Sequence, residues 1–598
     1  MKFTRPVFLA TLSVASMLIA PLSAQAEEQT PIIVTATRTA QTADETIAPV
    51  IVIDRSEIEN NPGAEVSDLL RMHAGIDIGR NGGPGQTTSI FIRGTESNHT
   101  LVMIDGIKIN PGTIGTAAIQ NIRLDMIERI EIVKGPRSTL YGSDAIGGVI
   151  NIITRRGKEG SHYQVNASHG SYKTTSLGFS ADNKVDDRAA GINVNIEKSK
   201  GYAIRTTSPI ERGYDNVNIN LYGKKRMGET NLEITHWQST GKTEYLDFFL
   251  TAVDQNYENS ATALNIENNY TANWLSKIKL SRINDRIDQN QGVDYAHTQR
   301  DVLDWQNDIQ LGNSQLVTAG IYFSNENTNA SVYGSNFDEN TDVKAIFAQD
   351  DATFGQHHVI AGIRSTHHKT YGTYNTWNID YAWQVNDSTR FILGSATGFR
   401  SPDSTDRFGG ATGNPNLLPE ESKNNELGIQ YVINKQQNVR VNYFQNDITN
   451  LIEYDFATSK MQNIAAARIK GTEIEYKFES ENWSVDASAI FQDPENQSDG
   501  SQLSRRTKTS YTAGINHMIN KHSIGIDVLY AGERDNSAYD TVILKSYTLA
   551  NLKAHFQASK HLSINARIEN LTDEVYELAS TYRTPARSYY AELVYNFD

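Results

Sequence analysis

The chain has 598 residues, no cysteine and a formal net charge of −15, from 70 acidic and 55 basic side chains. The absence of cysteine excludes a disulfide framework, a thiolate metal site and a cysteine nucleophile. The net negative charge argues against nucleic acid as a partner, because phosphate binding needs a basic surface. At roughly 100–200 residues per domain the length suggests three or four soluble domains, although one closed β-barrel can absorb the same length.

Residues 1–26 have the features of a secretory signal peptide. Lys2 and Arg5 precede an uncharged, mostly apolar stretch, and Ala-Gln-Ala at 24–26 has the small-x-small form of a cleavage site. A lone membrane helix is the alternative, but Pro21 and the cleavage signal follow too soon for a stable span. Cleavage would remove two basic residues and leave a mature charge of −17.

The mature chain has no apolar run of the ~18–20 residues that a transmembrane helix needs. An exported chain of this kind is either soluble outside the inner membrane or an outer-membrane β-barrel, whose strands carry only a weak alternating signal.

The sequence divides near Arg155-Arg156. Residues 27–40 form a polar leader with one β-prone run, and residues 41–156 have the mixed character of a small α+β domain. In this domain we expect serine-capped helices at 56–59 and 67–71, strands at 127–133 and 148–154, and a turn at 135–142.

Residues 157–598 contain short stretches in which apolar and polar residues alternate, as in amphipathic β-strands. A soluble sandwich or propeller also alternates. Against it, the chain lacks a repeat of ~40–50 residues, Tyr outnumbers Phe by 28 to 19, and the chain ends in an aromatic strand in which Phe597 is followed only by Asp598. The clearest alternating stretches are 191–197, 217–221, 483–491, 562–569 and 589–597.

Length arithmetic favours a plugged barrel. A 22-stranded barrel needs roughly 220 residues in the membrane, which leaves about the same number for loops in the 442 residues of the segment 157–598. Barrels of 22 strands have a plugged lumen. The fold class predicted is therefore a transmembrane β-barrel of about 22 antiparallel strands with an N-terminal α+β plug inside it.

No catalytic constellation is present: the sequence lacks Gly-x-Ser-x-Gly, His-Glu-x-x-His and a phosphate loop, so we expect a protein that is not an enzyme. The pairs His357-His358 and His367-His368 fit metal ligands or, more simply, barrel turn and strand residues.

The run Thr30–Ala36 is suited to strand addition at the edge of another protein's sheet. Ile32, Ile33, Val34, Thr35 and Ala36 lie in this run. Further motifs lie at 91–94, 102–106, 127–137 and 141–151 in the N-terminal domain, and at 398–402, 414–422, 467–473 and 568–573 in the barrel segment. On these motifs the chain resembles the TonB-dependent outer-membrane transporters over essentially its whole mature length, and residues 32–36 resemble the TonB box of that family.

The resemblance implies a receptor in the outer membrane of a Gram-negative bacterium that binds a ligand too large for porins. TonB would pair with the exposed box and, powered by the proton gradient, pull on the plug. We expect Arg93, Arg129 and Arg137 to pair with Glu128, Glu131 and carboxylates of the barrel interior. Such pairs would hold the plug and still let it rearrange; ordinary solvated charge is the alternative. Membrane lipid and lipopolysaccharide would surround the barrel, and the protein would be a monomer.

Within the family, the resemblance is closest to the subgroup that transports cobalamin (vitamin B12), on segments 81–94 and 137–148. It implies ligand contacts from the plug and barrel. Glu96 departs from the amide-type residue typical of this subgroup. The implied ligand-binding residues are Thr87, Thr88, Ser89, Glu96, Ile114, Gly115, Thr116, Tyr245 and Arg506.

The same subgroup binds calcium through acidic outer loops, and hard oxygen ligands suit Ca²⁺. Asp215, Asp247 and Asp254 lie in the corresponding stretch, although the dense Asp-x-Asp cluster of the subgroup is missing. No redox or organic cofactor is implied. Ferric siderophores and haem are the alternative ligands, and the absence of histidine between Pro402 and Asn414 counts against haem. A passive porin is opposed by the plug and the box, and a surface receptor that does not transport is harder to exclude.

Overall fold

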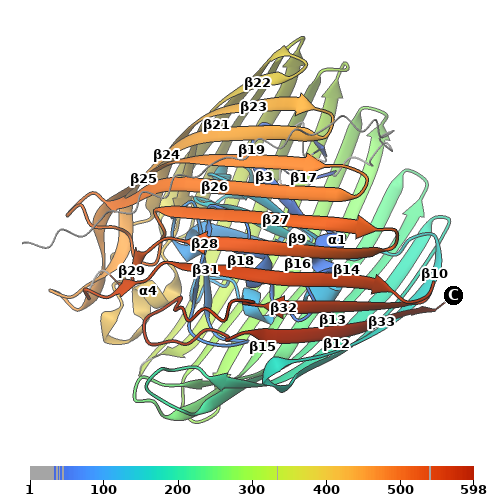
Figure 1. Cartoon of the computed structure of the whole chain (residues 1–598). Helices are drawn as coiled ribbons and strands as arrows, with labels where there is room; N and C mark the ends of the chain where they lie inside the picture. Colours follow the sequence, from blue (N-terminus) through green and yellow to red (C-terminus); the bar gives the residue numbers. More distant parts are fainter. Residues whose placement is uncertain are drawn as a thin grey trace, which may run out of the picture.

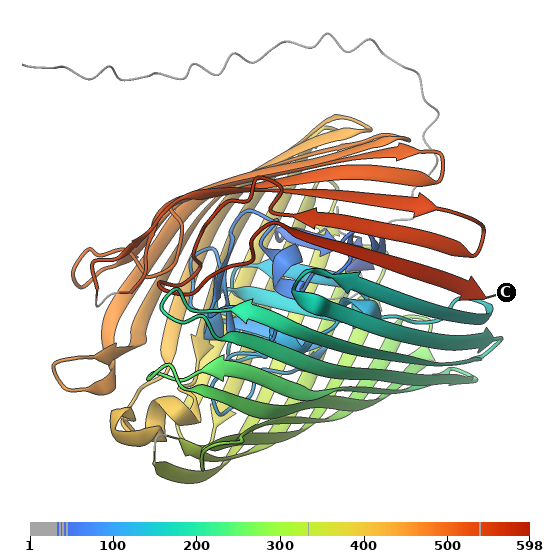
Figure 2. The same cartoon turned by 60° about the horizontal axis from the view of Figure 1, so that its bottom comes forward.

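The structure is a computed structural model that describes residues 33–34, 38, 41–42, 46–332, 334–537 and 540–597. It contains a closed barrel of 22 antiparallel strands with a compact domain inside its lumen, drawn in blue in Figures 1 and 2. The predicted fold class and strand number are confirmed. Across these described residues, no helix is long and apolar enough to cross a membrane.

The barrel strands follow one another around the wall in chain order. They are β10 (Gly160–Gly170), β11 (Thr174–Val185), β12 (Arg188–Ala203), β13 (Glu211–Met227), β14 (Thr230–Leu246), β15 (Ala252–Thr271), β16 (Trp274–Gln289), β17 (Tyr295–Leu311), β18 (Gln315–Val332), β19 (Ser335–Phe354), β20 (His357–His368), β21 (Gly372–Asn386), β22 (Thr389–Arg400), β23 (Glu420–Asn434), β24 (Gln437–Asp455), β25 (Lys460–Glu479), β26 (Trp483–Asn496), β27 (Thr509–Ile519), β28 (His522–Ala531), β31 (Tyr547–Gln557), β32 (Leu562–Glu569) and β33 (Ser588–Phe597).

The final strand closes the barrel. β33 pairs antiparallel with β10, from Tyr163 opposite Phe597 to Gly170 opposite Tyr590. Every barrel strand therefore has two neighbours, which satisfies the backbone hydrogen bonds that hydrocarbon cannot satisfy. The histidine pairs singled out in the sequence are the two ends of β20.

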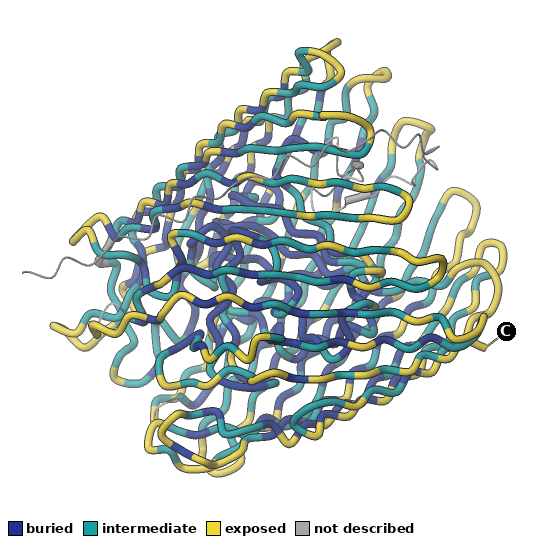
Figure 3. Tube along the Cα trace, in the orientation of Figure 1, coloured by how far each residue is buried: buried dark blue, intermediate teal, exposed yellow. Residues whose placement is uncertain are grey.

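The alternating pattern predicted for the strands is confirmed, with apolar side chains pointing outward. In β12, Ile192 and Ile196 are exposed on the outer surface, while Asn193 and Asn195 face the filled lumen and are buried. The outward apolar residue Ile363 keeps 66% of its surface exposed. Figure 3 shows buried residues concentrated inside the barrel and exposed ones on its wall and rims. This inside-out pattern is that of a wall between lipid and a polar interior.

The two ends of the barrel differ in their connections. At the end where the C-terminus lies, strands are joined by short turns such as 186–187 and 228–229. At the opposite end, long connections such as 401–419, 497–508 and 570–587 project beyond the strands. Outer-membrane barrels place short turns in the periplasm and long loops outside the cell, so the long-loop end is the extracellular end.

The inner domain is built on a five-stranded sheet of order β3-β8-β9-β6-β7, in which β6 and β9 are parallel. A hairpin, β4-β5, and three short α-helices complete it, and isoleucine, leucine and valine fill its core. Its elements are β3 (Val50–Ile53), α1 (Arg55–Glu59), α2 (Val66–Leu70), β4 (Ile76–Arg80), β5 (Thr88–Ile92), β6 (Thr100–Ile104), β7 (Ile107–Lys108), β8 (Ile127–Lys134), α3 (Ser138–Tyr141) and β9 (Gly148–Thr154).

The two strands predicted in this domain are confirmed as β8 and β9. The serine caps were wrong. Asp54 caps α1 by accepting a hydrogen bond from the Glu57 amide at 2.9 Å, and Glu65 occupies the N-cap position of α2. Both N-cap residues lie two positions before the expected serine, and aspartate caps a helix as well as serine does. Within the predicted turn, α3 forms one short helical turn.

Candidate functional site

Three plug loops reach the extracellular end and contact the barrel there. The Gln86 side chain donates to the backbone oxygen of Glu244 at the end of β14, at 2.7 Å. Glu96 forms an ion pair with Arg506 in the loop 497–508. The third plug loop, residues 110–118, touches the loop 401–419. We call residues 110–118 the plug apex and residues 401–419 the α4 loop, after the short helix α4 (Ser404–Phe408) that the latter contains.

Glu96 and Arg506, both predicted ligand residues, lie together. The Arg506 guanidinium pairs with the Glu96 carboxylate, donates to the Gly94 backbone oxygen at 3.2 Å, and lies over the Phe91 ring at 4.3 Å from its centre. Arg506 is 4% exposed. Its guanidinium therefore anchors the plug loop that carries Glu96, the more exposed member of the pair.

The remaining predicted plug residues divide into exposed and buried positions. Thr87 and Ile114 are exposed, Ser89 and Thr116 are half-buried, and Thr88 and Gly115 are buried. Gly115 has a φ of +70°, and a Cβ added to it would lie 3.1 Å from the Asp403 carboxylate of the α4 loop. The apex therefore needs glycine there for both its backbone conformation and the close approach of the loop. Tyr245 near the end of β14 is half-buried and hydrogen-bonded to Gln289.

The three aspartates predicted for calcium lie on separate features of the wall. Asp215 is in register with Lys198 and Lys242 on its neighbouring strands. Asp247 accepts hydrogen bonds from two amides of its own turn, Phe249 and Thr251, at 2.9 and 2.8 Å. Asp254 accepts hydrogen bonds from the side chains of Asn290 and Gln291, the latter at 3.1 Å. In the ranges that the structure describes, no three His, Asp or Glu side chains gather as a metal site.

The predicted TonB box lies largely outside the described residues, as does the predicted signal peptide, residues 1–26. Of the box, the structure describes the backbone of Ile33 and Val34, which pair as β1 (Ile33–Val34) with β2 (Gln41–Thr42). The nearby Arg38 pairs with Asp304 on the lumen face of β17 at 2.8 Å.

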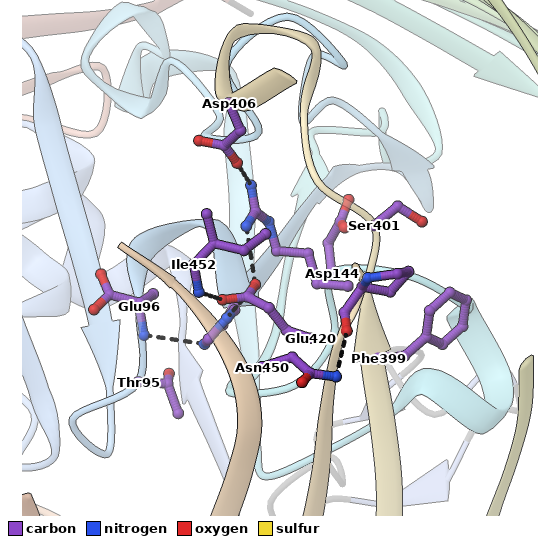
Figure 4. Close-up of polar contacts among 12 residues, drawn as sticks. Thr95, Glu96, Asp144, Phe399, Ser401, Asp406, Glu420, Asn450 and Ile452 are labelled. Carbon is purple, nitrogen blue, oxygen red and sulfur yellow. Dashed lines mark hydrogen bonds and ion pairs between the residues drawn. The ribbon is translucent and has the colours of Figure 1, made fainter. Parts of the chain in front are cut away.

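A buried charge network that the sequence analysis missed joins the plug to the α4 loop (Figure 4). Arg400 binds Glu420 at 2.9 Å, Asp403 at 2.8 Å and Asp406 at 2.9 Å. His99 of the plug contacts the same Glu420 carboxylate at 3.0 Å. Arg400 and Glu420 lie in segments 398–402 and 414–422 that were recognised as motifs, so the signal was present without a role attached to it.

A second network fixes the centre of the plug to the wall. Arg93 pairs with Glu473 and Glu426, both at 2.7 Å, and Lys134 pairs with Glu473 at 3.0 Å. Burial by itself would lower the pKa of Arg93, but the two carboxylates raise it above its ordinary value. All of these side chains except Glu426 are almost completely buried.

The predicted role of Arg93 as a plug-holding residue therefore agrees with its contacts. Arg129 instead pairs with Glu131 inside the plug at 2.7 Å, and Arg137 donates to the adjacent Pro136 backbone oxygen at 2.9 Å. The plug–barrel contacts at Arg93, His99 and Arg506 are polar, so they can exchange partners with water when the plug moves, whereas an apolar interface would have to expose apolar surface.

Comparison with known proteins places the chain in a family. Residues 42–149 match the TonB-dependent receptor plug domain, and residues 156–571 match the TonB-dependent receptor-like β-barrel. The vitamin B12 transporter BtuB of Vibrio vulnificus is 30% identical over 618 aligned residues, which cover 98% of this chain and 99% of that protein. The vitamin B12 transporter BtuB of Photobacterium profundum is 29% identical over 610 residues, with 99% of each chain covered.

Solved structures share the fold at lower identity. The siderophore receptor PirA from Acinetobacter baumannii superposes with a TM-score of 0.80 at 19% identity, covering 92% of this chain and 98% of PirA. The ferric enterobactin receptor PfeA from Pseudomonas aeruginosa gives a TM-score of 0.80 at 17% identity, covering 92% and 99%. Family models over both domains and a closed, plugged 22-stranded barrel show that the chain belongs to the TonB-dependent receptors, the plugged transporters of the Gram-negative outer membrane.

Proposed function

We propose that this transporter imports cobalamin across the outer membrane, energised through TonB by the proton gradient of the inner membrane. The observation that carries the proposal is the full-length similarity to two vitamin B12 transporters, at 30% and 29% identity. The siderophore receptors PirA and PfeA are 19% and 17% identical and so support the fold alone.

The site supports this proposal chemically. Thr87 and Ile114 are exposed and present a hydroxyl and an apolar side chain on the plug, and Glu96 of a third plug loop forms an ion pair with Arg506 of the barrel. Cobalamin is a large, largely uncharged ligand edged by amides, and such a ligand is bound by a few oriented polar groups on a mostly apolar surface.

Binding of labelled cyanocobalamin to the purified protein tests the ligand. Saturable binding that unlabelled cyanocobalamin displaces is expected. No saturable binding, with or without Ca²⁺, would overturn the cobalamin proposal. Saturable binding of a ferric siderophore in its place would establish the second candidate, which the fold shared with PirA and PfeA keeps open.

We further propose that residues Ile32–Ala36 are the segment that TonB captures by strand addition. Deletion of residues 30–36 is expected to abolish cobalamin uptake by cells and to leave binding to the purified protein unchanged, because the segment precedes the plug. As a control, replacing the preceding residues 27–29 with glycine and serine keeps uptake. Normal uptake by the deletion variant would refute energised transport through this segment.

Calcium is a separate proposal that rests on Asp215, Asp247 and Asp254. The variant with all three changed to asparagine should lose any Ca²⁺-dependent gain in cobalamin affinity. A gain that persists in the variant would place the ion elsewhere, and an affinity that is independent of Ca²⁺ in the wild type would remove the proposal.

The outer wall is apolar around the barrel, with exposed residues such as Leu177 on β11, Ile346 on β19 and Ile515 on β27, three strands that are far apart in the strand order. This distribution supports a monomer surrounded by lipid and lipopolysaccharide. Light scattering of the detergent-purified protein, corrected for bound detergent and lipid, tests the monomer.

A further inference from the structure

The α4 loop is held directly on the plug apex. The amide of Ser404 donates to the backbone oxygen of Gly112, and the amide of Thr405 donates to that of Thr113, both at 2.9 Å. The first amides of a helix have no partner within the helix. Here the plug backbone supplies the acceptors for two of these amides, so both amides are hydrogen-bonded to protein only while the plug apex is in place.

The start of the same loop touches the plug at a second place. The Ser401 amide donates to the Ser143 hydroxyl at 3.1 Å, and the Asp144 amide donates to the backbone oxygen of Phe399 at 3.2 Å. The loop is therefore fastened to two plug segments that are well separated in sequence.

Arg400 fixes the loop at the point where it leaves the barrel wall. It is 1% exposed, and its guanidinium bonds to Glu420, the first residue of β23, and to Asp403 and Asp406 of the α4 loop. One guanidinium thus joins both ends of the loop, because β22 ends at Arg400 and β23 begins at Glu420.

Glu420 links this guanidinium to the ligand face of the plug. Its carboxylate accepts from the Ile452 amide at 2.9 Å and contacts His99 at 3.0 Å. The other ring nitrogen of His99 accepts from the Glu96 amide at 3.2 Å, and Glu96 pairs with Arg506. The contacts visible in Figure 4 therefore run without a gap from the Glu96 loop to the α4 helix.

The C-terminal part of the α4 loop is hydrogen-bonded to the barrel. The Asn414 side chain donates to the Met461 backbone oxygen at 2.9 Å, and Asn463 exchanges two hydrogen bonds with the Leu418 backbone at 2.8 and 2.9 Å. Met461 and Asn463 are on β25. When the plug moves, the loop must stay with the barrel, so the contacts that break are those with the plug.

We propose that Arg400 is a positioning residue that holds the α4 loop closed on the plug apex, and that this loop separates from residues 112–113 each time a ligand is transported. The inference rests on TonB-dependent transport, which the family establishes, and it uses cobalamin only as a probe. Arg400 acts through the loop that it orients.

The absence of cysteine in the chain allows a direct test by disulfide trapping. Thr113→Cys with Thr405→Cys joins the loop to the plug, and Asn414→Cys with Gln462→Cys joins the loop to the barrel as a matched control. Oxidation of the first pair is expected to reduce cobalamin uptake by at least tenfold, with recovery on reduction and binding retained. The control pair keeps uptake in both redox states. Normal uptake by the oxidised first pair overturns separation of the loop from the plug.

Arg400 is tested without any ligand, by the rate at which the first cysteine pair oxidises. Arg400→Gln is expected to slow this reaction at least tenfold, and Arg400→Lys to restore part of the rate. A wild-type rate in Arg400→Gln overturns the positioning role. Heat-modifiable mobility on gels confirms that each variant has a folded barrel. This measurement needs no cobalamin. If the wild-type protein fails to bind cobalamin, the proposed ligand is refuted, and the oxidation rate still tests the role of Arg400.

Discussion

The Arg38 guanidinium lies 2.8 Å from the Asp304 carboxylate on the lumen face of β17. It also lies over the rings of Tyr141 in the plug and Phe347 in the barrel, at 4.9 and 4.8 Å from their centres, and the Gln306 side chain donates to the Arg38 backbone oxygen at 3.2 Å. The chain just after the predicted TonB box is thus fastened between plug and wall.

Asp304→Asn should release this attachment. A hydrogen bond to a charged group contributes about 1.5–3 kcal/mol. In the absence of ligand, the thiol of Val34→Cys should therefore react with a water-soluble thiol reagent at least tenfold faster in the Asp304→Asn background than in the wild-type background. Asp301→Asn is the matched control, since Asp301 lies on the same strand and pairs with Arg282 at 2.6 Å on the outer wall. Equal rates in the two variants would show that Asp304 does not restrain the segment.

Glu473→Gln should loosen the plug. Glu473 neutralises both Arg93 and Lys134, and breaking a buried ion pair destabilises by about 3–5 kcal/mol because the remaining charges are left buried. Hydrogen exchange should show plug amides losing protection at lower urea, while barrel amides keep theirs. Glu475→Gln is the control, because Glu475 is partly exposed and lies farther from Lys134, at 3.3 Å. An unchanged plug transition in Glu473→Gln would contradict the assignment.

Arg506→Ala should weaken cobalamin binding by about tenfold through loss of the support under Glu96, since a charged contact of this kind contributes ~1.5–3 kcal/mol. If Arg506 acts only by orienting Glu96, then Glu96→Gln and Arg506→Ala are not additive, and the double variant binds like the weaker single variant. Fully additive losses, measured by equilibrium binding of labelled cyanocobalamin, would show instead that each residue contacts the ligand independently.

Closure of the α4 loop should depend on pH. Burial and the neighbouring Asp406 carboxylate raise the pKa of Asp403 well above its ordinary value, against the opposing effect of Arg400. A raised carboxyl pKa means that the closed loop favours protonated Asp403. This contribution is fully present below the ordinary pKa of about 3.9 and is lost as the pH rises through the raised value.

Hydrogen exchange of the α4 amides, corrected for the intrinsic effect of pH, should therefore show protection falling from acidic to neutral pH. Glu420, which bonds to the same guanidinium, and His99, which contacts Glu420, stay unchanged in the test variant. Asp406→Asn removes one cause of the raised pKa, so the fall in protection should move to lower pH. Protection that rises with pH in the wild type would reverse the sign and refute this account.

The type of fold and the approximate number of barrel strands could be predicted because each strand has its own alternation of apolar and polar residues. Ile192 and Ile196 face lipid while Asn193 and Asn195 face the lumen, and this alternation is readable in seven residues. The serine caps were predicted wrongly for an equally local reason: Ser56 and Ser67 are the second residues of helices that begin directly after Asp54 and Glu65, and a helix of five residues is too short to show a 3.6-residue period.

Only part of the candidate site could be predicted from the sequence. Glu96 and Arg506 were named from resemblance, but their ion pair joins positions 410 residues apart in sequence, which no local pattern encodes. Arg400 and Glu420 lie in segments that resemble family motifs, but the motifs do not show their role, which depends on the contact of Glu420 with His99 of the plug.

The sequence by itself determined the strand alternation and the plugged barrel, because period-two amphipathicity is a local property of the chain and the length of the barrel segment fits about 22 strands. Only the tertiary structure decided which charges meet. Arg38 with Asp304, Arg93 with Glu473, and Arg400 with Glu420 and the α4 loop are contacts that form once the plug is folded inside the wall. Their partners are chosen by the position of the plug in the lumen, which is set by the packing of the whole domain.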